Sequence, residues 1–387
     1  MSKEKSGVEV REVKTKRELK DFVYITDKIF KGSPYYVPSF KSDDMKMLDR
    51  ARNPALESCE ILPLVAYRGG RPVARVLGVI QSLWIQKTGK KQARFHYFDA
   101  FDDFEAVGLM FARLEAWARG RGMDAVHGPL GFNDTDREGM LIEGFDTLGT
   151  FVSLYNHPYY PELMAKLGYV KDADWVQYRL KLPDQGDRIT KLFEDMSERA
   201  LKRQNLRFAR CGSGREYVDR YGMEILRLVN IAYADLYGTV EFSDAVARNM
   251  IKMFKILMTR DMFSLLLNEQ DRLVAFAFCF PSISRALNKS RGRLFPLGLL
   301  RILWARKHYK VVDFGLVGVL PEYRDKGLPA ALMIDFGRRF MSMKRIERME
   351  TNLMLEDNTD VHSLFRHFEK EQYRRNRAYI KELKTEN

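Results

Sequence analysis

The sequence predicts an α/β fold in two halves, and three observations support this prediction. The chain has 387 residues, more than one hydrophobic core usually supports. Apolar residues make up 45% and charged residues 30%, a balance typical of globular domains. Strand-like and helix-like segments also follow the same order twice. We therefore expect domains at residues 1–183 and 184–387, with the boundary near Pro183 in a Pro- and Gly-containing linker at residues 179–191.

The first half begins with a strand and a helix and continues through a hairpin whose turn contains two glycines. Alternating apolar residues predict the strands, and apolar residues three or four positions apart predict the helices. The expected elements are a strand at Val8–Val13, a helix at Lys16–Phe30, a hairpin around Tyr67–Pro72, a strand at Ala93–Phe101, a helix at Phe104–Arg121, a strand at Asp124–Gly128 and an aromatic-rich helical segment at Tyr155–Tyr169.

The second half repeats this order. A repeated order of elements is better explained by two copies of one α/β fold than by chance. The expected elements are a strand at Leu206–Cys211, helices at Tyr217–Leu236 and Ser243–Met258, a hairpin at Met262–Phe280, a strand at Val311–Val319, a helix at Gly327–Met341, a strand at Ile346–Leu353, a helix at Asn358–Glu369 and a strand at Gln372–Lys381.

A glycine-containing loop joins the strand at 311–319 to the next helix. Its sequence is "VGVLPEYRDKGLP", with Arg324, Lys326 and Gly327 just before the helix. Free N–H groups and the helix dipole at such a helix start favour a bound phosphate. An ordinary surface turn, in which Gly327 only supplies backbone freedom, is the alternative.

This loop and the order of elements around it resemble the GNAT superfamily of acyl-CoA-dependent N-acyltransferases. The resemblance implies two tandem GNAT-like domains, each a mixed, mostly antiparallel sheet flanked by helices. It implies that backbone amides in the loop bind the CoA pyrophosphate, and that Val317 to Val319 run beside the pantetheine and present an oxyanion donor. Pro329 departs from the pattern, because proline has no N–H to donate. The implied cofactor-binding residues are Val317, Val319, Arg324, Asp325, Lys326, Gly327, Leu328 and Asn358, which begins the next helix.

The first half lacks such a loop. Its glycine-rich stretch "GPLGFNDTDREGMLIEGF", at Gly128–Phe145, has no Arg-x-x-Gly pattern. We therefore expect residues 1–183 to be a degenerate copy without cofactor.

The resemblance implies a proton-donating Tyr at a position that holds Phe365 in this chain. His362 and Tyr373 are replacements of suitable chemistry, since both can transfer protons. Glu241, in the loop between two helices, and Glu350, on a strand, are candidate bases. Three of them also have a plain alternative: His362 as a helix-surface histidine without a role, and Glu241 and Glu350 as solvated carboxylates.

An insertion at residues 284–310 mixes basic and apolar side chains ahead of the loop strand. This composition suits an anionic membrane surface, where Trp304 prefers the interface. The segment is too short and too charged to span a bilayer. Alternatively, Leu297, Leu300, Ile302 and Leu303 pack beneath the sheet.

The chain as a whole resembles the tandem-GNAT group that includes the bacterial ceramide synthases, which implies transfer of a fatty acyl group from acyl-CoA to a long-chain base. A net charge of +13 favours anionic partners, although no nucleic-acid module is recognisable, so we expect none bound. Three scattered cysteines predict neither disulfides nor a metal site. A charged N-terminus predicts a cytoplasmic protein, and the basic, apolar insertion predicts that it is peripheral at the inner membrane. The alternatives are a soluble N-acetyltransferase for small amines or protein lysines, a tRNA-dependent aminoacyl transferase and a non-catalytic membrane-surface scaffold.

Overall fold

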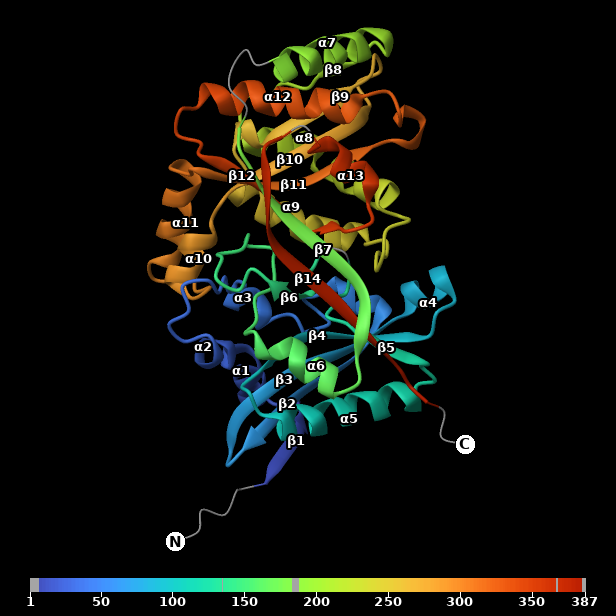
Figure 1. Cartoon of the computed structure of the whole chain (residues 1–387), viewed down its shortest axis with the longest axis vertical. Helices are drawn as coiled ribbons and strands as arrows, with labels where there is room; N and C mark the ends of the chain where they lie inside the picture. The colour runs from blue at the N-terminus through green and yellow to red at the C-terminus, as the bar shows by residue number, and fades with distance from the viewer. Residues whose placement is uncertain (1–6, 134, 183–187, 367, 385–387) are drawn as a thin grey trace. The chain divides into compact units, whose positions relative to one another are not determined.

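The computed structural model describes residues 7–133, 135–182, 188–366 and 368–384, and these form two compact units (Figure 1). Unit 1 comprises Met1–Trp175, Leu287–Leu294 and Arg374–Asn387. Unit 2 comprises Val176–Ala286 and Phe295–Tyr373. Both units combine a sheet with flanking helices, so the predicted α/β class is confirmed.

The described residues up to Leu180 contain seven strands, with helices between them. In chain order the elements are β1 (Val8–Glu12), α1 (Lys16–Tyr24), α2 (Thr26–Ile29), α3 (Lys41–Asp44), η1 (Pro54–Ser58), β2 (Cys59–Arg68), β3 (Arg71–Gln81), α4 (Ser82–Thr88), β4 (Gln92–Ala100), α5 (Phe104–Gly120), β5 (Ala125–Gly128), β6 (Met140–Glu143), α6 (Tyr159–Lys166) and β7 (Val170–Leu180).

The remaining elements include the longest helices. They are α7 (Arg188–Arg203), β8 (Arg207–Phe208), α8 (Gly214–Ala232), α9 (Asp244–Leu257), η2 (Arg260–Met262), β9 (Phe263–Leu267), β10 (Leu273–Pro281), α10 (Ser284–Ser290), α11 (Gly298–Lys307), β11 (Val311–Val319), η3 (Pro321–Tyr323), α12 (Leu328–Ser342), β12 (Arg348–Thr351), β13 (Met354–Leu355), α13 (Thr359–Leu364) and β14 (Lys370–Glu382).

The sheet of unit 1 has the order β1-β2-β3-β4-β5-β14, in which only β4 and β5 run parallel. Alternate residues of its strands enter different cores, as the period of two in a strand requires. On β3, Val76 packs with Phe111 and Leu114 of α5, whereas Leu77 packs with Phe22 of α1. The sheet therefore has a helix layer on each face.

The sheet of unit 2 has the order β7-β12-β11-β10-β9-β8, and β11 and β12 form its parallel pair. Helices α8 and α9 pack together, and α8 contacts β10 and β11. Helix α12 contacts β9, β10 and β11, and α7 lies against α12 (Figure 1). The two units thus repeat one plan around a central parallel pair.

Each unit contains part of a strand that its position in the sequence would assign to the other unit. Strand β7 begins in unit 1, but its end, Val176–Leu180, pairs with β12 of unit 2. Strand β14 begins in unit 2, but from Arg374 onward it pairs with β5 and β6 of unit 1. The insertion also gives eight residues, Leu287–Leu294, to unit 1. The expected boundary near Pro183 lies outside the described residues and stays a prediction.

Most expected elements are present, with shifts at their ends. The expected helix at 16–30 is interrupted at Ile25 and forms α1 and α2. The expected helix at 358–369 shortens to α13, and the expected strand at 206–211 shortens to β8. Helix α7 occupies part of the expected linker. Among the described residues, no helix is both long and apolar enough to cross a membrane.

Candidate functional site

The loop after β11 presents an open helix start. Gly327 immediately precedes α12 with a φ of +72°, a left-handed conformation that favours glycine. No side chain caps this helix among the described residues, and Pro329 lies in its first turn. Residues 324–327 are exposed, whereas Leu328 is buried and anchors the helix on the sheet. The local sequence therefore builds an accessible positive end of a helix dipole.

The amides of this loop are not all equally available. The Arg324 N–H is donated to the Pro321 carbonyl at 3.2 Å. In the described part of the chain, the amides of Asp325, Lys326 and Gly327 make no such bond. The Lys326 ammonium lies 4.8 Å from the Tyr323 ring centroid, so this cation stays beside the loop. Three of the five predicted amides, those of Asp325, Lys326 and Gly327, therefore remain available to a ligand, whereas the Arg324 amide is already bonded within the loop.

Strands β11 and β12 separate just before this loop. Their parallel ladder runs from Val311 to Phe314, and β11 alone continues to Val319. Between Phe314 and Val317, two residues of β11 oppose one residue of β10, which is a β-bulge. The Tyr233 hydroxyl, at the end of α8, donates to the Val317 carbonyl at 2.9 Å and lies 3.3 Å from the Val317 nitrogen. The Tyr233 hydroxyl thereby contacts both backbone polar groups of Val317, a predicted cofactor-binding residue.

The third rung of this parallel ladder places two carboxylates side by side. Asp313 of β11 pairs in register with Glu350 of β12, and Phe280 of β10 lies opposite Asp313. Side chains directly opposite one another share a face of the sheet. The Phe280 ring lies 5.7 Å from that of Phe254 in α9, so both carboxylates lie on the face that α9 covers.

Asp313 is 2% exposed, and neither of its carboxylate oxygens has a well-aligned hydrogen-bond partner among the described residues. Burial, followed by the negative charge of Glu350, raises the pKa of Asp313 well above its usual range. Ser282 and Arg348 lower this pKa by less. Asp313 is therefore a carboxyl group that keeps a proton at a pH where exposed carboxyls have lost theirs.

Glu350, a predicted base, is buried but paired. Its Oε1 lies 2.9 Å from Arg348 and 3.3 Å from Arg179 of β7. The Arg179 guanidinium also lies 4.4 Å from the ring centroid of Tyr373. The structure therefore brings two of the four predicted catalytic residues, Glu350 and Tyr373, into one cluster around Arg179.

The other predicted residues lie in separate surroundings. The His362 Nε2 is 2.9 Å from the Leu355 carbonyl, and Asn358 caps α13 by accepting the Val361 N–H at 3.2 Å. Glu241 is exposed on the loop between α8 and α9. Phe365 is fully buried, with its ring 5.4 Å from that of Phe314. The position of the missing proton donor is therefore part of the apolar core.

Sequence reasoning missed Asp313 and Tyr233. Asp313 is a lone acid inside an apolar strand, "VVDFGLVGV", and this was the signal that could have identified it, since a buried strand rarely tolerates an unpaired charge. Tyr233 carries no comparable signal, because its contact with Val317 joins residues 84 positions apart.

The insertion exposes its apolar side chains, contrary to the core-packing alternative. Helix α11 buries Ile302, and Arg306 donates to the Met258 carbonyl at 3.0 Å. The outward residues are apolar, and Phe295 and Trp304 are 77% and 65% exposed. We call this set the apolar patch: Phe295, Leu297, Leu300, Leu303 and Trp304. Of the four residues expected in the core under that alternative, only Ile302 is buried there.

Comparison with known proteins places these features in context. No family model matches the sequence. The chain is 27% identical over 383 residues to Protein YghO of Escherichia coli (strain K12), covering 97% of this chain and 95% of that protein. It is 26% identical over 385 residues to the bacterial ceramide synthase of Caulobacter vibrioides (strain NA1000 / CB15N), covering 96% of each. Among solved structures it is similar to a tandem GNAT protein from the clavulanic acid biosynthesis pathway, with a TM-score of 0.57, 13% identity and coverage of 98% and 100%.

Within residues 7–133, 135–182, 188–366 and 368–384, no group of three His, Cys, Asp or Glu side chains could hold a metal ion.

Proposed function

We propose that this chain, a member of the tandem-GNAT group, is an acyl-CoA-dependent N-acyltransferase that joins a fatty acyl group to the amine of a long-chain, sphingoid-type base. The observation that carries this proposal is the uncapped, exposed start of α12, in the loop that follows β11 beyond the point where β11 and β12 separate. The similarity to a bacterial ceramide synthase over 96% of both chains supports the choice of acceptor.

Unit 2 would bind the cofactor. The amides of Asp325, Lys326 and Gly327 would donate to the pyrophosphate, and the Arg324 and Lys326 side chains would add charge. Val317 and Val319 would line the pantetheine, which requires the Tyr233 hydroxyl to leave or share the Val317 backbone groups. Asn358 and Leu328 would shape the site through the start of α13 and the anchor of α12.

The chemistry requires a neutral amine. Its nitrogen attacks the thioester carbon, the carbon–sulfur bond breaks, and one proton leaves the nitrogen while the sulfur gains one. Asp313, whose pKa burial and Glu350 raise well above its usual range, would in its ionised form accept the proton from the amine. Tyr233 would supply a proton to the sulfur in place of the apolar Phe365. Glu350, held by Arg179 and Arg348, would tune Asp313, while His362, Glu241 and Tyr373 stay predictions.

A membrane surface would deliver a lipidic acceptor. The apolar patch turns Leu300, Leu303 and Trp304 outward on one side of α11, at helical spacing i, i+3 and i+4. Exposed Lys307 extends this side, so that apolar groups and a cation face the same way. This arrangement supports peripheral binding to anionic lipid.

We expect Leu300→Ser combined with Trp304→Ser to weaken sedimentation with anionic vesicles by about tenfold or more, because each buried apolar side chain contributes roughly 1.5–3 kcal/mol. Ile256→Ser is the matched control, since Ile256 is also an exposed apolar residue, on α9. Undiminished vesicle binding by the double variant would remove the patch from the proposal.

An acyl-transfer assay tests the reaction itself. The purified chain is supplied with palmitoyl-CoA or acetyl-CoA and with a long-chain base, a polyamine or a lysine peptide, and the new amide is measured by mass spectrometry. We expect the long-chain pair to react fastest. Efficient acetylation of polyamines or lysines, with no long-chain amide, would replace the lipid acceptor by a small or protein amine.

A further inference from the structure

Unit 1 contains an open pocket of about 290 Å³ that lies apart from the loop and strands described above. Its lining comes from α2, from the turn that follows α2 and from residues 288–291 of the insertion. Phe30 and Tyr36 form one wall, with stacked rings whose centroids are 4.2 Å apart. Gly32 opens another side, because a β-carbon at this position would have no neighbour within 4 Å.

The insertion residues that belong to unit 1, Leu287–Leu294, are fixed within that unit by specific bonds. The Asn288 side-chain amide donates to the carbonyls of Ser33 at 3.1 Å and Tyr36 at 2.8 Å. The Gly292 carbonyl accepts the Lys41 N–H at 3.0 Å. Arg291, between these contacts, has a φ of +51°, a left-handed conformation that costs a non-glycine residue energy. The chain thus accepts strain at the residue that brings a guanidinium group to the pocket.

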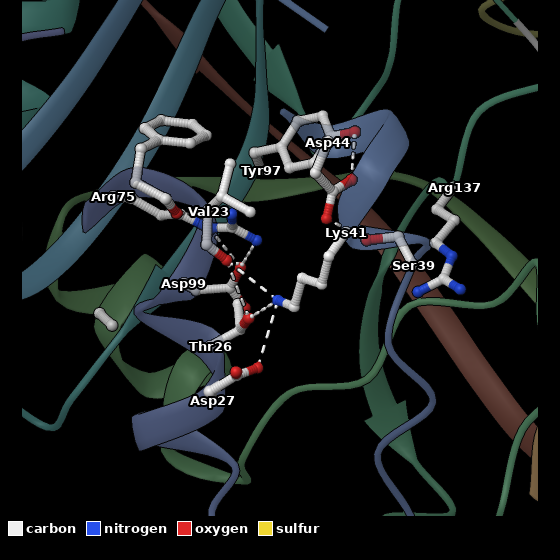
Figure 2. Close-up of polar contacts among 12 residues, drawn as sticks. Val23, Thr26, Asp27, Ser39, Lys41, Asp44, Arg75, Tyr97, Asp99 and Arg137 are labelled. Atoms are coloured by element: carbon white, nitrogen blue, oxygen red, sulfur yellow. Dashed lines mark hydrogen bonds and ion pairs between the residues drawn. The ribbon is translucent and has the colours of Figure 1, made fainter. Parts of the chain in front are cut away.

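The carboxylate at the pocket is already neutralised. Asp27 pairs with the buried Lys41 at 3.3 Å and with Arg293 at 2.8 Å. Lys41 is held from behind, because its ammonium also donates to the Val23 carbonyl at 3.0 Å and to the Thr26 hydroxyl at 2.7 Å (Figure 2). Asp27 is the one carboxylate among the lining residues, and it is already paired with two cations. The pocket therefore offers little to a cationic ligand.

The remaining charges of the lining are positive. Lys31, Lys289 and Arg291 are exposed and come from two separate segments of the chain. Among the lining residues, these three cations stand against the single carboxylate of Asp27. A guanidinium and ammonium groups around an open, glycine-edged pocket are the chemistry that binds a phosphate.

We propose that this pocket binds a phosphate group, and that its source is the headgroup of a membrane phospholipid. The source follows from continuity along the chain: Arg291 is four residues before Phe295, the first member of the apolar patch. One segment would then hold a headgroup phosphate and continue into side chains suited to the acyl boundary. The source rests on the membrane contact proposed above, whereas the phosphate site depends only on the pocket.

Titration calorimetry with glycerol 3-phosphate, a soluble headgroup fragment, and with inorganic phosphate tests the site. We expect saturable binding that falls by about tenfold in Lys31→Gln and in Arg291→Gln, because each change removes a charge-assisted hydrogen bond. Lys28→Gln is the matched control, since Lys28 is an exposed cation of α2 outside the lining. No saturable binding, or binding that survives both pocket changes together, overturns the proposal.

Vesicles then identify the source. Sedimentation with phosphatidylglycerol vesicles should fall in Arg291→Gln and stay unchanged in Lys28→Gln, and soluble glycerol 3-phosphate should compete with the vesicles. Loss of phosphate binding with no change in sedimentation would overturn the lipid source and assign the pocket to a soluble phosphate ester. Acyl-CoA binding, measured in the same variants, should stay at the parental level. If the parent chain itself bound no acyl-CoA, that result would count against the proposed acyltransferase and not against the phosphate pocket.

Discussion

Unit 1 and unit 2 share one order of elements, but they place opposite charges at the end of their parallel strand pair. The third rung pairs Arg94 with His127 in unit 1 and Asp313 with Glu350 in unit 2. Burial lowers the pKa of His127, so unit 1 keeps one cation beside a neutral ring. Burial and Glu350 raise the pKa of Asp313, so unit 2 keeps a carboxyl group able to exchange a proton. One backbone arrangement thus holds a fixed charge in one copy and a carboxyl group with a raised pKa in the other.

The helices that follow β4 in unit 1 and β11 in unit 2 also differ, in whether an acidic side chain caps their N-terminus. In unit 1, Asp103 caps α5 by accepting the Ala106 N–H at 3.1 Å, and it pairs with Arg68 at 2.7 Å. In unit 2, Gly327 leaves the start of α12 uncapped. A carboxylate cap satisfies the amides that a phosphate would need and repels the phosphate as well. The comparison thus gives a physical reason to expect no phosphate site at the start of α5, because the chain supplies its own anion there.

The glycine-rich loop of unit 1 is closed in the same way. Asp136 accepts the amides of Phe132 at 2.7 Å and Asn133 at 3.3 Å. A β-carbon on Gly131 would lie 2.2 Å from that of Asp136, so the aspartate packs directly on the glycine. Burial raises the pKa of Asp136 to about 6 despite these bonds. The expected degeneracy of the first copy gains a physical reason, although its lack of cofactor stays a prediction.

The largest expected effect comes from giving unit 2 the anion that unit 1 already has. Gly327→Glu places a carboxylate and a β-carbon at a left-handed position in the loop. We expect acyl-CoA affinity, measured by calorimetry, to fall by about 100-fold or more, which corresponds to roughly 2.7 kcal/mol.

Gly122→Glu is the control for this change. Gly122 has a φ of +73°, lies in unit 1 and has open space around it, so it reports the cost of the strain alone. A folded Gly327→Glu variant that bound acyl-CoA like the parent would place the cofactor elsewhere and end the comparison.

The next largest effect tests the acidic rung. Asp313→Asn removes proton exchange and keeps the shape of the side chain, so we expect acyl-transfer turnover to fall by about 100-fold, within the usual range for loss of a general base. The pH profile should lose the limb on which activity rises with pH. Glu241→Gln, an exposed residue, provides the comparison, and an equal loss there would favour the loop residue as base.

The features of unit 2 that the sequence predicted are formed by residues close together in the chain. The loop at Gly327 and the strand before it are contiguous, so their periodicity and composition indicate a phosphate site. The environment of Asp313 depends on Glu350, Phe280 and α9, which are brought together only by the sheet. The exchange of β7 and β14 between units is likewise a choice of partner strand, and strand pairing over long distances leaves no periodicity in the sequence. Helix α13 likewise ends at Leu364, earlier than its sequence pattern indicated.

A smaller effect tests the cap of unit 1. We expect Asp103→Ala to destabilise unit 1 by about 1–2 kcal/mol, because it removes an N-cap and the partner of Arg68. Denaturant unfolding measures the loss, and Asp102→Ala, its exposed neighbour, is the control. Acyl-CoA binding at unit 1 should not appear. If it did, the cap alone would separate the two copies, and the charged rung and the closed loop would be irrelevant to cofactor loss.

The smallest expected effect concerns stability as the pH falls from 8 to 5. The contribution of His127 to the stability of unit 1 should decrease, whereas that of Asp313 to the stability of unit 2 should increase. An unfolded His127 takes up a proton near pH 6.5, but the buried ring resists it, so its contribution to stability is lost as the pH decreases. Asp313 behaves oppositely. The folded carboxyl binds a proton at a pH where the unfolded one, with a pKa near 3.8, does not, so its contribution is complete below that value and is lost as the pH rises through the folded pKa.

Hydrogen exchange of the amides in β4 and β5, compared with those in β11 and β12, measures both trends. Other groups of unit 1 also titrate, since burial lowers the pKa of His96 to about 3 and raises that of Asp136 to about 6. Comparing the parent with His127→Gln and with Asp313→Asn cancels these contributions, because each variant differs at one rung only. We expect His127→Gln to remove part of the acid-induced loss in unit 1, and Asp313→Asn to protect unit 2 more at pH 8 than at pH 5. Equal protection at both pH values in Asp313→Asn would mean that Asp313 is ionised in the folded chain, and the two copies would then differ in charge but not in the capacity to hold a proton.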